Sequence, residues 1–105
     1  MKYTTKHLNN MQAEDIFNDA MEELRQIRNE DDSVYRLRTC TAWVYETDNF
    51  YILRSYNTYV ACIEKATGFA ADVLRKVYGY TATSSQHISK FFKDYFARNI
   101  YTYRT

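Results

Sequence analysis

A histidine follows a run of hydroxyl side chains near the C-terminal end of the sequence. His87 comes after Thr83, Ser84 and Ser85, and a hydroxyl beside an imidazole is the pairing that nucleophilic catalysis uses. The same residues also suit a helix start, because Ser and Thr side chains accept hydrogen bonds from free backbone amides and Gln86 stands at the capping-box distance from Thr83. No paired acid and base completes a catalytic set. We therefore favour the helix start and predict no catalytic residue and no enzymatic activity.

The predicted helix start offers a second kind of chemistry. Free amides at a helix N-terminus can receive a phosphate or a carboxylate, and Lys90 and Lys93 follow within the same helix. The hydroxyl side chains compete for the same amides. Self-capping is therefore the favoured interpretation, with anion binding as the alternative.

The cysteines and acidic residues lack the spacing of a metal or redox site. Cys40 and Cys62 fall inside apolar, strand-like runs and form no C-x-x-C pair. We expect buried free thiols, with an inter-strand disulfide as the alternative. The sequence predicts no metal site and no cofactor.

Two amphipathic helices are predicted at the two ends of the sequence. From Asn10 to Arg28, apolar residues recur at the spacing of one helix face. A second stripe follows the cap at Thr83. The first stripe is Ala13, Ile16, Phe17, Ala20, Leu24 and Ile27, and the second is Ile88, Phe91, Phe92 and Tyr95.

Strand-forming segments fill the region between the helices. Val34 to Tyr45 is predicted as one long strand, and Phe50 to Arg54 and Tyr59 to Lys65 follow, separated by short polar turns. The segment 69–78 fits a strand or a short helix, and we favour a fourth strand. The tail from Asn99 either docks as an extra strand or frays. The expected fold is α+β: an N-terminal acidic amphipathic helix, a three- to four-stranded antiparallel β-meander, and a C-terminal helix packed on the sheet.

Length and composition place limits on the function. The 105 residues, 46% of them hydrophobic, suit a single domain spanning 1–105. A net charge of +1 gives no general reason to expect a polyanion-binding protein. Neither a long apolar stretch nor an apolar signal-peptide core appears, so we expect no membrane span and a cytoplasmic location. A monomer and a homodimer both remain open, since an uncovered Tyr-rich sheet face could pair with a second copy.

Charge is divided unevenly along the chain. Residues 10–32 hold eight acidic residues against two Arg, a net charge of −6, and the rest of the chain sums to +7. An acidic helix face of this kind can imitate nucleic-acid phosphates and dock on a basic groove of a partner. A face that is merely solvated is the alternative. The candidate partner-binding residues of this helix are Glu14, Asp15, Asp19, Glu22 and Glu23.

Aromatic residues make up 17% of the chain, and 11 of them are Tyr. Tyr and Trp supply large rings with a polar group at the edge and are enriched among the residues that dominate binding energy at protein interfaces. The candidate aromatic anchors are Tyr35, Trp43, Tyr45, Tyr51, Tyr56 and Tyr59. The basic residues support an alternative surface, because cations interleaved with aromatic rings bind single-stranded nucleic acid. Its candidate residues are Arg36, Arg38, Arg54, Lys90, Lys93 and Arg98.

Two segments resemble small uncharacterised proteins of bacteriophages and mobile elements. They are SYNTYVACIE, from Ser55 to Glu64, and VYGYTATSSQHISKFF, from Val77 to Phe92. The span that contains both segments, from Ser55 to Phe92, covers about 40 of the 105 residues. The positions that match the helix-entry pattern are Tyr80, Thr81, Thr83, Ser84 and His87. The resemblance implies a phage or prophage origin, a bacterial host cell and a non-enzymatic role.

These observations lead to one favoured function and one alternative. The favoured function is a small binding protein that inhibits a host defence system, in the manner of an anti-CRISPR protein, by occluding a surface of a host protein such as a CRISPR-associated nuclease. The alternative is a nucleic-acid-binding regulator that uses the basic sheet face and the C-terminal helix.

Overall fold

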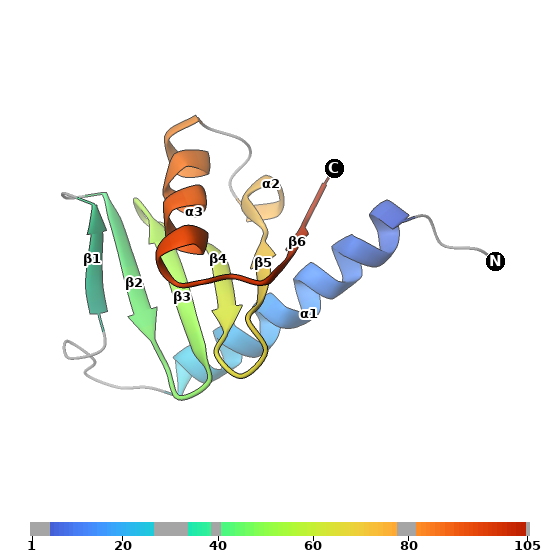
Figure 1. Ribbon diagram of the computed structural model, residues 1–105, viewed down its shortest axis with the longest axis horizontal. Helices are drawn as coiled ribbons and strands as arrows, with labels where there is room; N and C mark the ends of the chain where they lie inside the picture. The colour runs from blue at the N-terminus through green and yellow to red at the C-terminus, as the bar shows by residue number, and fades with distance from the viewer. Residues whose placement is uncertain (1–4, 27–33, 39–40, 78–81, 105) are drawn as a thin grey trace.

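A mixed β-sheet forms the middle layer of the molecule and separates two helical layers (Figure 1). The computed structural model describes residues 5–26, 34–38, 41–77 and 82–104. Within these residues the fold is α+β, as the sequence predicts. The elements in chain order are α1 (Thr5–Arg25), β1 (Val34–Arg38), β2 (Ala42–Glu46), β3 (Phe50–Ser55), β4 (Thr58–Glu64), β5 (Phe69–Asp72), α2 (Leu74–Val77), α3 (Ala82–Asp94) and β6 (Asn99–Thr102).

The order of the strands in the sheet follows their order in the sequence. The described strands form one six-stranded sheet, β1-β2-β3-β4-β5-β6. The first five pair antiparallel with their neighbours, whereas β6 runs parallel to β5. Helices α2 and α3 lie between β5 and β6 in sequence, which is the kind of crossover that a parallel pair needs.

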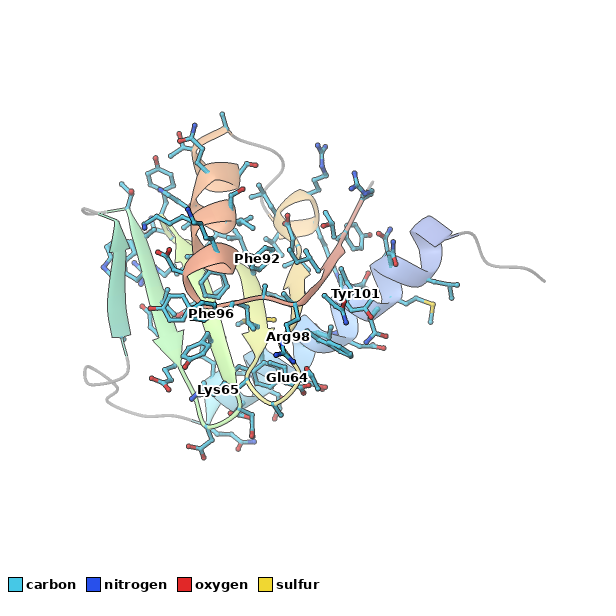
Figure 2. The ribbon with its side chains drawn as sticks, viewed as in Figure 1. Glu64, Lys65, Phe92, Phe96, Arg98 and Tyr101 are labelled. Atoms are coloured by element: carbon cyan, nitrogen blue, oxygen red, sulfur yellow. The ribbon has the colours of Figure 1, made fainter. Side chains whose placement is uncertain are left out.

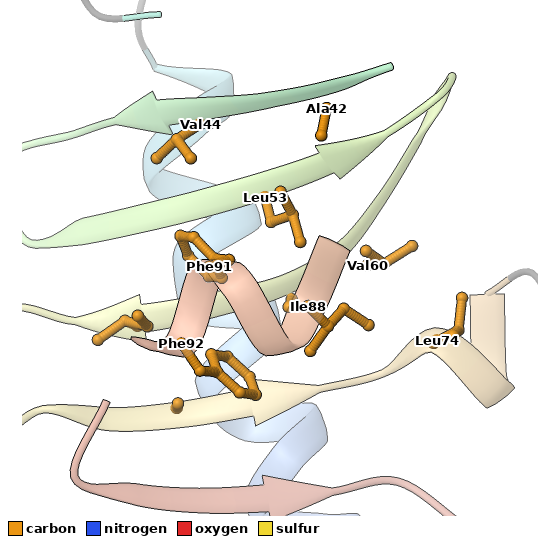
Figure 3. Close-up of a cluster of buried hydrophobic side chains, with 11 residues drawn as sticks. Ala42, Val44, Leu53, Val60, Leu74, Ile88, Phe91 and Phe92 are labelled. Atoms are coloured by element: carbon orange, nitrogen blue, oxygen red, sulfur yellow. The ribbon is translucent and has the colours of Figure 1, made fainter. Parts of the chain in front are cut away.

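Helix α3 covers one face of the sheet. Ile88, Phe91 and Phe92 of α3 are buried among side chains from several strands, including Leu53 of β3 and Val60 of β4 (Figure 3). These helix positions follow the 3.6-residue period of an amphipathic helix, so a single stripe of α3 supplies the contact.

Helix α1 covers the opposite face. Ala13, Ile16 and Ala20 pack on Ile52 of β3 and Cys62 of β4, together with residues of β5. Figure 1 shows α1 running diagonally behind the sheet. Its contacts are mainly with β3, β4, β5 and β6. The two faces of the sheet therefore have separate cores, each completed by a different helix.

The predicted long strand from Val34 to Tyr45 is wrong. The chain reverses between Arg38 and Ala42, and β1 and β2 pair antiparallel. The sequence shows no turn signal there, because the β-forming alternation continues without Gly, Pro, Asn or Asp. Since a strand rises about 3.3 Å per residue, an unbroken strand of this length would reach about 40 Å, far longer than is usual.

The predicted strand number and the predicted helix bounds also need correction. Segment 69–78 contains both of the competing structures, with β5 ending at Asp72 and α2 beginning at Leu74. Together with β6, this gives five antiparallel strands and one parallel strand in place of three or four. Helix α1 spans Thr5–Arg25 where Asn10 to Arg28 was expected. Helix α3 begins at Ala82, so Thr83 lies inside its first turn and is not the residue before it.

Cys62 is a free thiol in the core between α1 and the sheet. Burial raises the pKa of the Cys62 thiol far above its ordinary value, because the thiolate would lose its hydration in the apolar core. The thiolate needed for reaction with an alkylating reagent is therefore suppressed in the folded state. The prediction for Cys40 lies outside the described residues.

Asp72 joins several elements at the end of β5. Its Oδ1 accepts a hydrogen bond of 3.1 Å from the backbone N–H of Leu74, at the start of α2. Its backbone carbonyl accepts a bond of 2.7 Å from the N–H of Tyr103. Burial raises the pKa of the Asp72 carboxyl, and the bond from Leu74 and the charges of Arg75 and Arg104 offset this only in part.

We predict that Asp72→Asn changes the pH dependence of stability. A carboxyl whose pKa is raised by folding binds its proton more tightly in the folded state, so its contribution to stability is present at low pH and is lost as pH rises through the folded pKa. Asn keeps the acceptor for Leu74 but cannot ionise. The stability of the variant relative to wild type, measured by urea unfolding, should be higher at about pH 7 than at about pH 3. An equal difference at both pH values would contradict the prediction.

Candidate functional site

A row of aromatic and arginine side chains crosses three strands on one face of the sheet. Trp43 of β2 pairs with Arg54 of β3, and Arg54 pairs with Tyr59 of β4. The Arg54 guanidinium lies 4.8 Å from the centre of the Trp43 ring, and its Nη1 donates a hydrogen bond of 2.8 Å to the Tyr45 hydroxyl. Tyr45 and Tyr59 meet edge to face at 5.4 Å. We call Trp43, Tyr45, Arg54 and Tyr59 the aromatic ladder.

The aromatic ladder lies on the same side of the sheet as α1. Tyr45 and Tyr59 pack against the core beneath α1. All four side chains of the ladder are half-buried. Burial raises the pKa of the Tyr59 hydroxyl, and the neighbouring Tyr45 raises it further. Because hydrogen bonds and ring contacts already fix these rings, little side-chain entropy remains to be lost on binding.

The outer surface of α1 carries exposed carboxylates. Asp15, Asp19 and Glu22 are exposed, and we call these three residues the acidic face. Glu22 forms an ion pair of 2.7 Å with Arg25. For Asp15 and Asp19, the described part of the chain supplies no ion-pair partner. A shallow acidic cleft of about 340 Å³ adjoins this face, lined by Asp19, Glu22, Glu23, Gln26, Asn49, Phe50 and Glu64.

Two of the predicted acidic residues hold α1 in place. Glu23 accepts hydrogen bonds from Asn49, at 2.7 Å from the backbone N–H and at 3.0 Å from Nδ2. Burial pushes the pKa of Glu23 upward, but hydrogen bonds from Thr47 and Asn49 outweigh it and the net shift is downward. Glu14 pairs with Lys76 of α2 at 3.0 Å. Both carboxylates therefore have partners within the fold, which sequence reasoning missed because those partners are distant in sequence.

The other predicted aromatic anchors lie elsewhere. Tyr51 is on the α3 side of the sheet, where its ring lies 4.8 Å from that of Tyr95. Tyr56 is exposed in the turn after β3, and its ring lies 5.8 Å from the His87 ring. The structure describes only the backbone of Tyr35, so the prediction for its side chain lies outside what is described.

The predicted basic residues do not form one surface. Arg54 belongs to the aromatic ladder on the α1 side, whereas Lys90 and Lys93 lie on α3, on the opposite side. Arg98 follows α3 in the connection to β6. The side chains of Arg36 and Arg38 lie outside what the structure describes. Their backbone register pairs Arg36 with Trp43 and, after an irregularity, Arg38 with Ala42.

A buried hydrogen-bond network surrounds His87 and fixes α3 to the sheet. Ser55 Oγ lies 2.8 Å from His87 Nδ1 and 2.9 Å from Ser84 Oγ. Thr41 Oγ1 lies 3.3 Å from His87 Nε2. The sequence indicated Ser84 and His87 together as a helix start, but nothing in it indicated Thr41 or Ser55, which come from distant strand ends.

The distance between Ser55 and His87 suits a nucleophile and its base, but the burial of the pair does not. Ser55 and His87 are each only 1% exposed. A substrate atom could not reach the Ser55 hydroxyl without separating α3 from the sheet. The arrangement therefore satisfies buried polar groups and specifies how α3 packs.

Comparisons with known proteins add no relationship to these observations. No protein-family model, curated protein or solved structure matches the chain. Among the helices that the structure describes, none is long and apolar enough to cross a membrane. Within the same residues, no group of three or more His, Cys, Asp or Glu side chains is placed to hold a metal ion. The candidate functional site therefore consists of the aromatic ladder and the acidic face.

We predict that Ser55→Ala destabilises the fold. The substitution removes one hydrogen-bond partner from each of two buried groups, His87 Nδ1 and Ser84 Oγ, which should cost about 1–3 kcal/mol. Ser89→Ala is the matched control, because Ser89 is exposed on α3, the helix that carries Ser84 and His87, and should change stability by less than about 0.5 kcal/mol. Urea unfolding of both variants tests this. Equal effects would show that the network adds no stability.

Proposed function

We propose that the protein is a small, non-enzymatic binding protein that occludes a basic surface of a protein partner. The observation that carries the proposal is that the acidic face and the aromatic ladder belong to one side of the molecule. Glu23 anchors the C-terminal half of α1 to Asn49 in the turn between β2 and β3, the strands that carry Trp43 and Arg54. A single partner can therefore contact both groups.

The composition of this side suits a protein interface. Trp, Tyr and Arg are the residues that most often dominate binding energy at such interfaces, and the aromatic ladder contains all three. Charged groups around an aromatic centre steer the partner and set its orientation. Here Asp15, Asp19 and Glu22 supply those charges, and they are complementary to a basic surface.

The same charges disfavour nucleic acid as the ligand of this side. A strand laid across Trp43 and Tyr59 would bring its phosphates towards the carboxylates of α1, where like charges repel. The cations that could have compensated are divided between the two sides of the sheet. A protein with a basic groove is therefore the better partner for the α1 side.

The most specific form of the proposal is an inhibitor of a host defence nuclease, of the anti-CRISPR type, acting in the cytoplasm of a bacterial cell. Nucleases of this kind carry basic grooves for nucleic acid. An acidic face seated in such a groove would compete with the phosphates. The resemblance of residues 55–64 and 77–92 to phage and mobile-element proteins supports this choice of partner.

We predict that Asp15→Asn combined with Asp19→Asn weakens partner binding without unfolding the protein. The tagged protein is used to retain partners from a nuclease-treated bacterial lysate, and the retained protein is then purified for affinity measurement. Loss of the two charges should weaken binding at low salt by about fivefold or more and should reduce its salt dependence.

The matched control for this double variant is Gln86→Lys combined with Ser89→Lys. It changes the net charge by the same amount at exposed positions of α3, on the other side of the sheet. It should leave the affinity unchanged. If both double variants weaken binding equally, the effect reflects net charge and not the acidic face, and the proposal fails.

We predict that Trp43→Ala lowers the affinity for the same purified partner by about thirtyfold, the effect typical of a residue that dominates an interface. Phe96→Ala is the control, because Phe96 is exposed on the α3 side of the sheet. Circular dichroism establishes that each variant is folded. Unchanged binding by a folded Trp43→Ala variant would remove the aromatic ladder from the interface.

A further inference from the structure

A cleft of about 410 Å³ opens on the α3 side of the sheet, away from the proposed partner surface. It lies between the turn that joins β4 to β5 and the connection from α3 to β6. Figure 2 shows Phe96 at the end of α3, with Arg98 beside the turn that carries Glu64 and Lys65. The rings of Tyr51, Tyr95 and Phe96 and the cations of Lys65 and Arg98 line the cleft.

Phe96 occupies a backbone position where glycine is the usual residue. Its φ is 61°, in the left-handed region. The N–H of Ala97 donates to the carbonyl of Phe92 at 2.9 Å and the N–H of Phe96 to that of Lys93 at 3.4 Å, which is the Schellman ending of a helix. A side chain with a Cβ is strained there.

Burial of the Phe96 side chain does not compensate for the free-energy cost of this strain. Phe96 is 81% exposed, more than any other large apolar residue among those that the structure describes. The strained backbone lowers the stability of the protein relative to glycine at this position, and the exposed ring contributes little to offset that cost. Residues that are costly for stability in this way are typical of binding sites.

Arg98 lies next to Phe96 in the cleft, and the fold fixes its position. Its backbone N–H donates to the carbonyl of Gly68 at 2.8 Å. Its aliphatic part lies so close to Gly68 that a Cβ added there would be only 2.8 Å from Arg98 Cγ. The packing thus depends on glycine at position 68 and restrains the arginine side chain before any ligand binds.

The Arg98 guanidinium has no ion-pair partner among the described residues. Of the other charged groups nearby, Lys65 and Asp94 form ion pairs, whereas Glu64, which also lines the cleft, accepts a hydrogen bond. Lys65 pairs with Glu46 and lies over the Tyr51 ring, and Glu64 accepts a hydrogen bond from the Thr67 hydroxyl. Asp94 pairs with Lys90. Arg98 is therefore the cation of this cleft that is available to an anionic ligand.

We propose that this cleft binds one nucleotide unit, with the base stacked on Phe96 and the phosphate paired with Arg98. An exposed aromatic face accepts any base, and the planar guanidinium matches the oxygens of a phosphate. A free mononucleotide and a nucleotide within a single strand share this chemistry. Phe96 and Arg98 belong to neither the acidic face nor the aromatic ladder, although Glu64 lines both this cleft and the acidic cleft beside α1.

The experiment measures the binding of a fluorescently labelled ten-nucleotide single strand of mixed sequence, by anisotropy at low salt. Its duplex form and unlabelled mononucleotides are the comparison ligands. Wild type should bind the single strand more tightly than the duplex, in which the bases cannot reach Phe96. Competition by mononucleotides would show that one nucleotide fills the site, and a lack of competition would show that the site requires a strand.

The variants separate stacking from charge. Phe96→Gly and Arg98→Ala should each weaken single-strand binding by about fivefold or more. Phe96→Trp keeps an aromatic ring and should bind the single strand about as tightly as wild type. Lys93→Ala removes one exposed cation of α3 outside the cleft and should have a smaller effect. Phe96→Gly should also raise the midpoint of thermal unfolding, so lost binding cannot be explained by lost folding. Phe96→Asn, which also tolerates the left-handed backbone, is a second variant that lacks the ring.

Several outcomes would overturn the proposal. These are absence of single-strand binding at low salt, equal binding of the duplex, or equal losses for Lys93→Ala and Arg98→Ala. Binding of a Glu–Tyr copolymer in place of the oligonucleotide would assign the cleft to an acidic peptide. Asp15→Asn with Asp19→Asn should not weaken oligonucleotide binding, so this proposal and the proposed function can fail separately.

Discussion

The two central strands bury apolar side chains on both of their faces, and the rest of the structure depends on this constraint. In β3, Ile52 faces α1 and Leu53 faces α3, and in β4 Cys62 and Ile63 divide in the same way. A sheet that is apolar on both faces must be covered twice. The chain meets this need with one helix before the meander and another after it. The crossover through α3 then returns the chain beside β5, which is why β6 pairs in parallel.

Because helices cover both faces of the sheet, the side chains available for binding form two separate groups, one on each side. The residues available on the α1 side are carboxylates and a fixed aromatic ladder. On the α3 side, Arg98 and an exposed ring line a cleft. The exposed carboxylates of the acidic face and the Arg98 cation of the cleft thus lie on different sides of the sheet. The two sides therefore suit ligands of different classes, and Glu64, which lines both clefts, joins them.

Sequence reasoning identified features that depend on periodicity and local chemistry. The stripes of α1 and α3, the α+β class and the exposure of Asp15, Asp19 and Glu22 follow from helical spacing alone. The antiparallel pairing of β1 with β2 was missed because the sequence between Arg38 and Ala42 contains no Gly, Pro, Asn or Asp. The contacts of Glu23 with Asn49 and of His87 with Ser55 join residues 26 and 32 positions apart, and no local pattern encodes such pairs. Sequence reasoning also could not predict the left-handed backbone conformation of Phe96, because no residue type that favours a positive φ stands there.

The strand order has a consequence for how the chain folds. Each of the first four pairings joins consecutive strands through a short turn, so β1 to β5 can assemble from local contacts at a small entropic cost. Helix α1 is different, because it packs on β5 and β6, at the other end of the sequence. The side chain of Asn10 even completes two hydrogen bonds of 2.8 Å with the backbone of Arg104, 94 positions away. The meander is thus expected to form first, and the docking of α1 closes the longest loop and completes the second core.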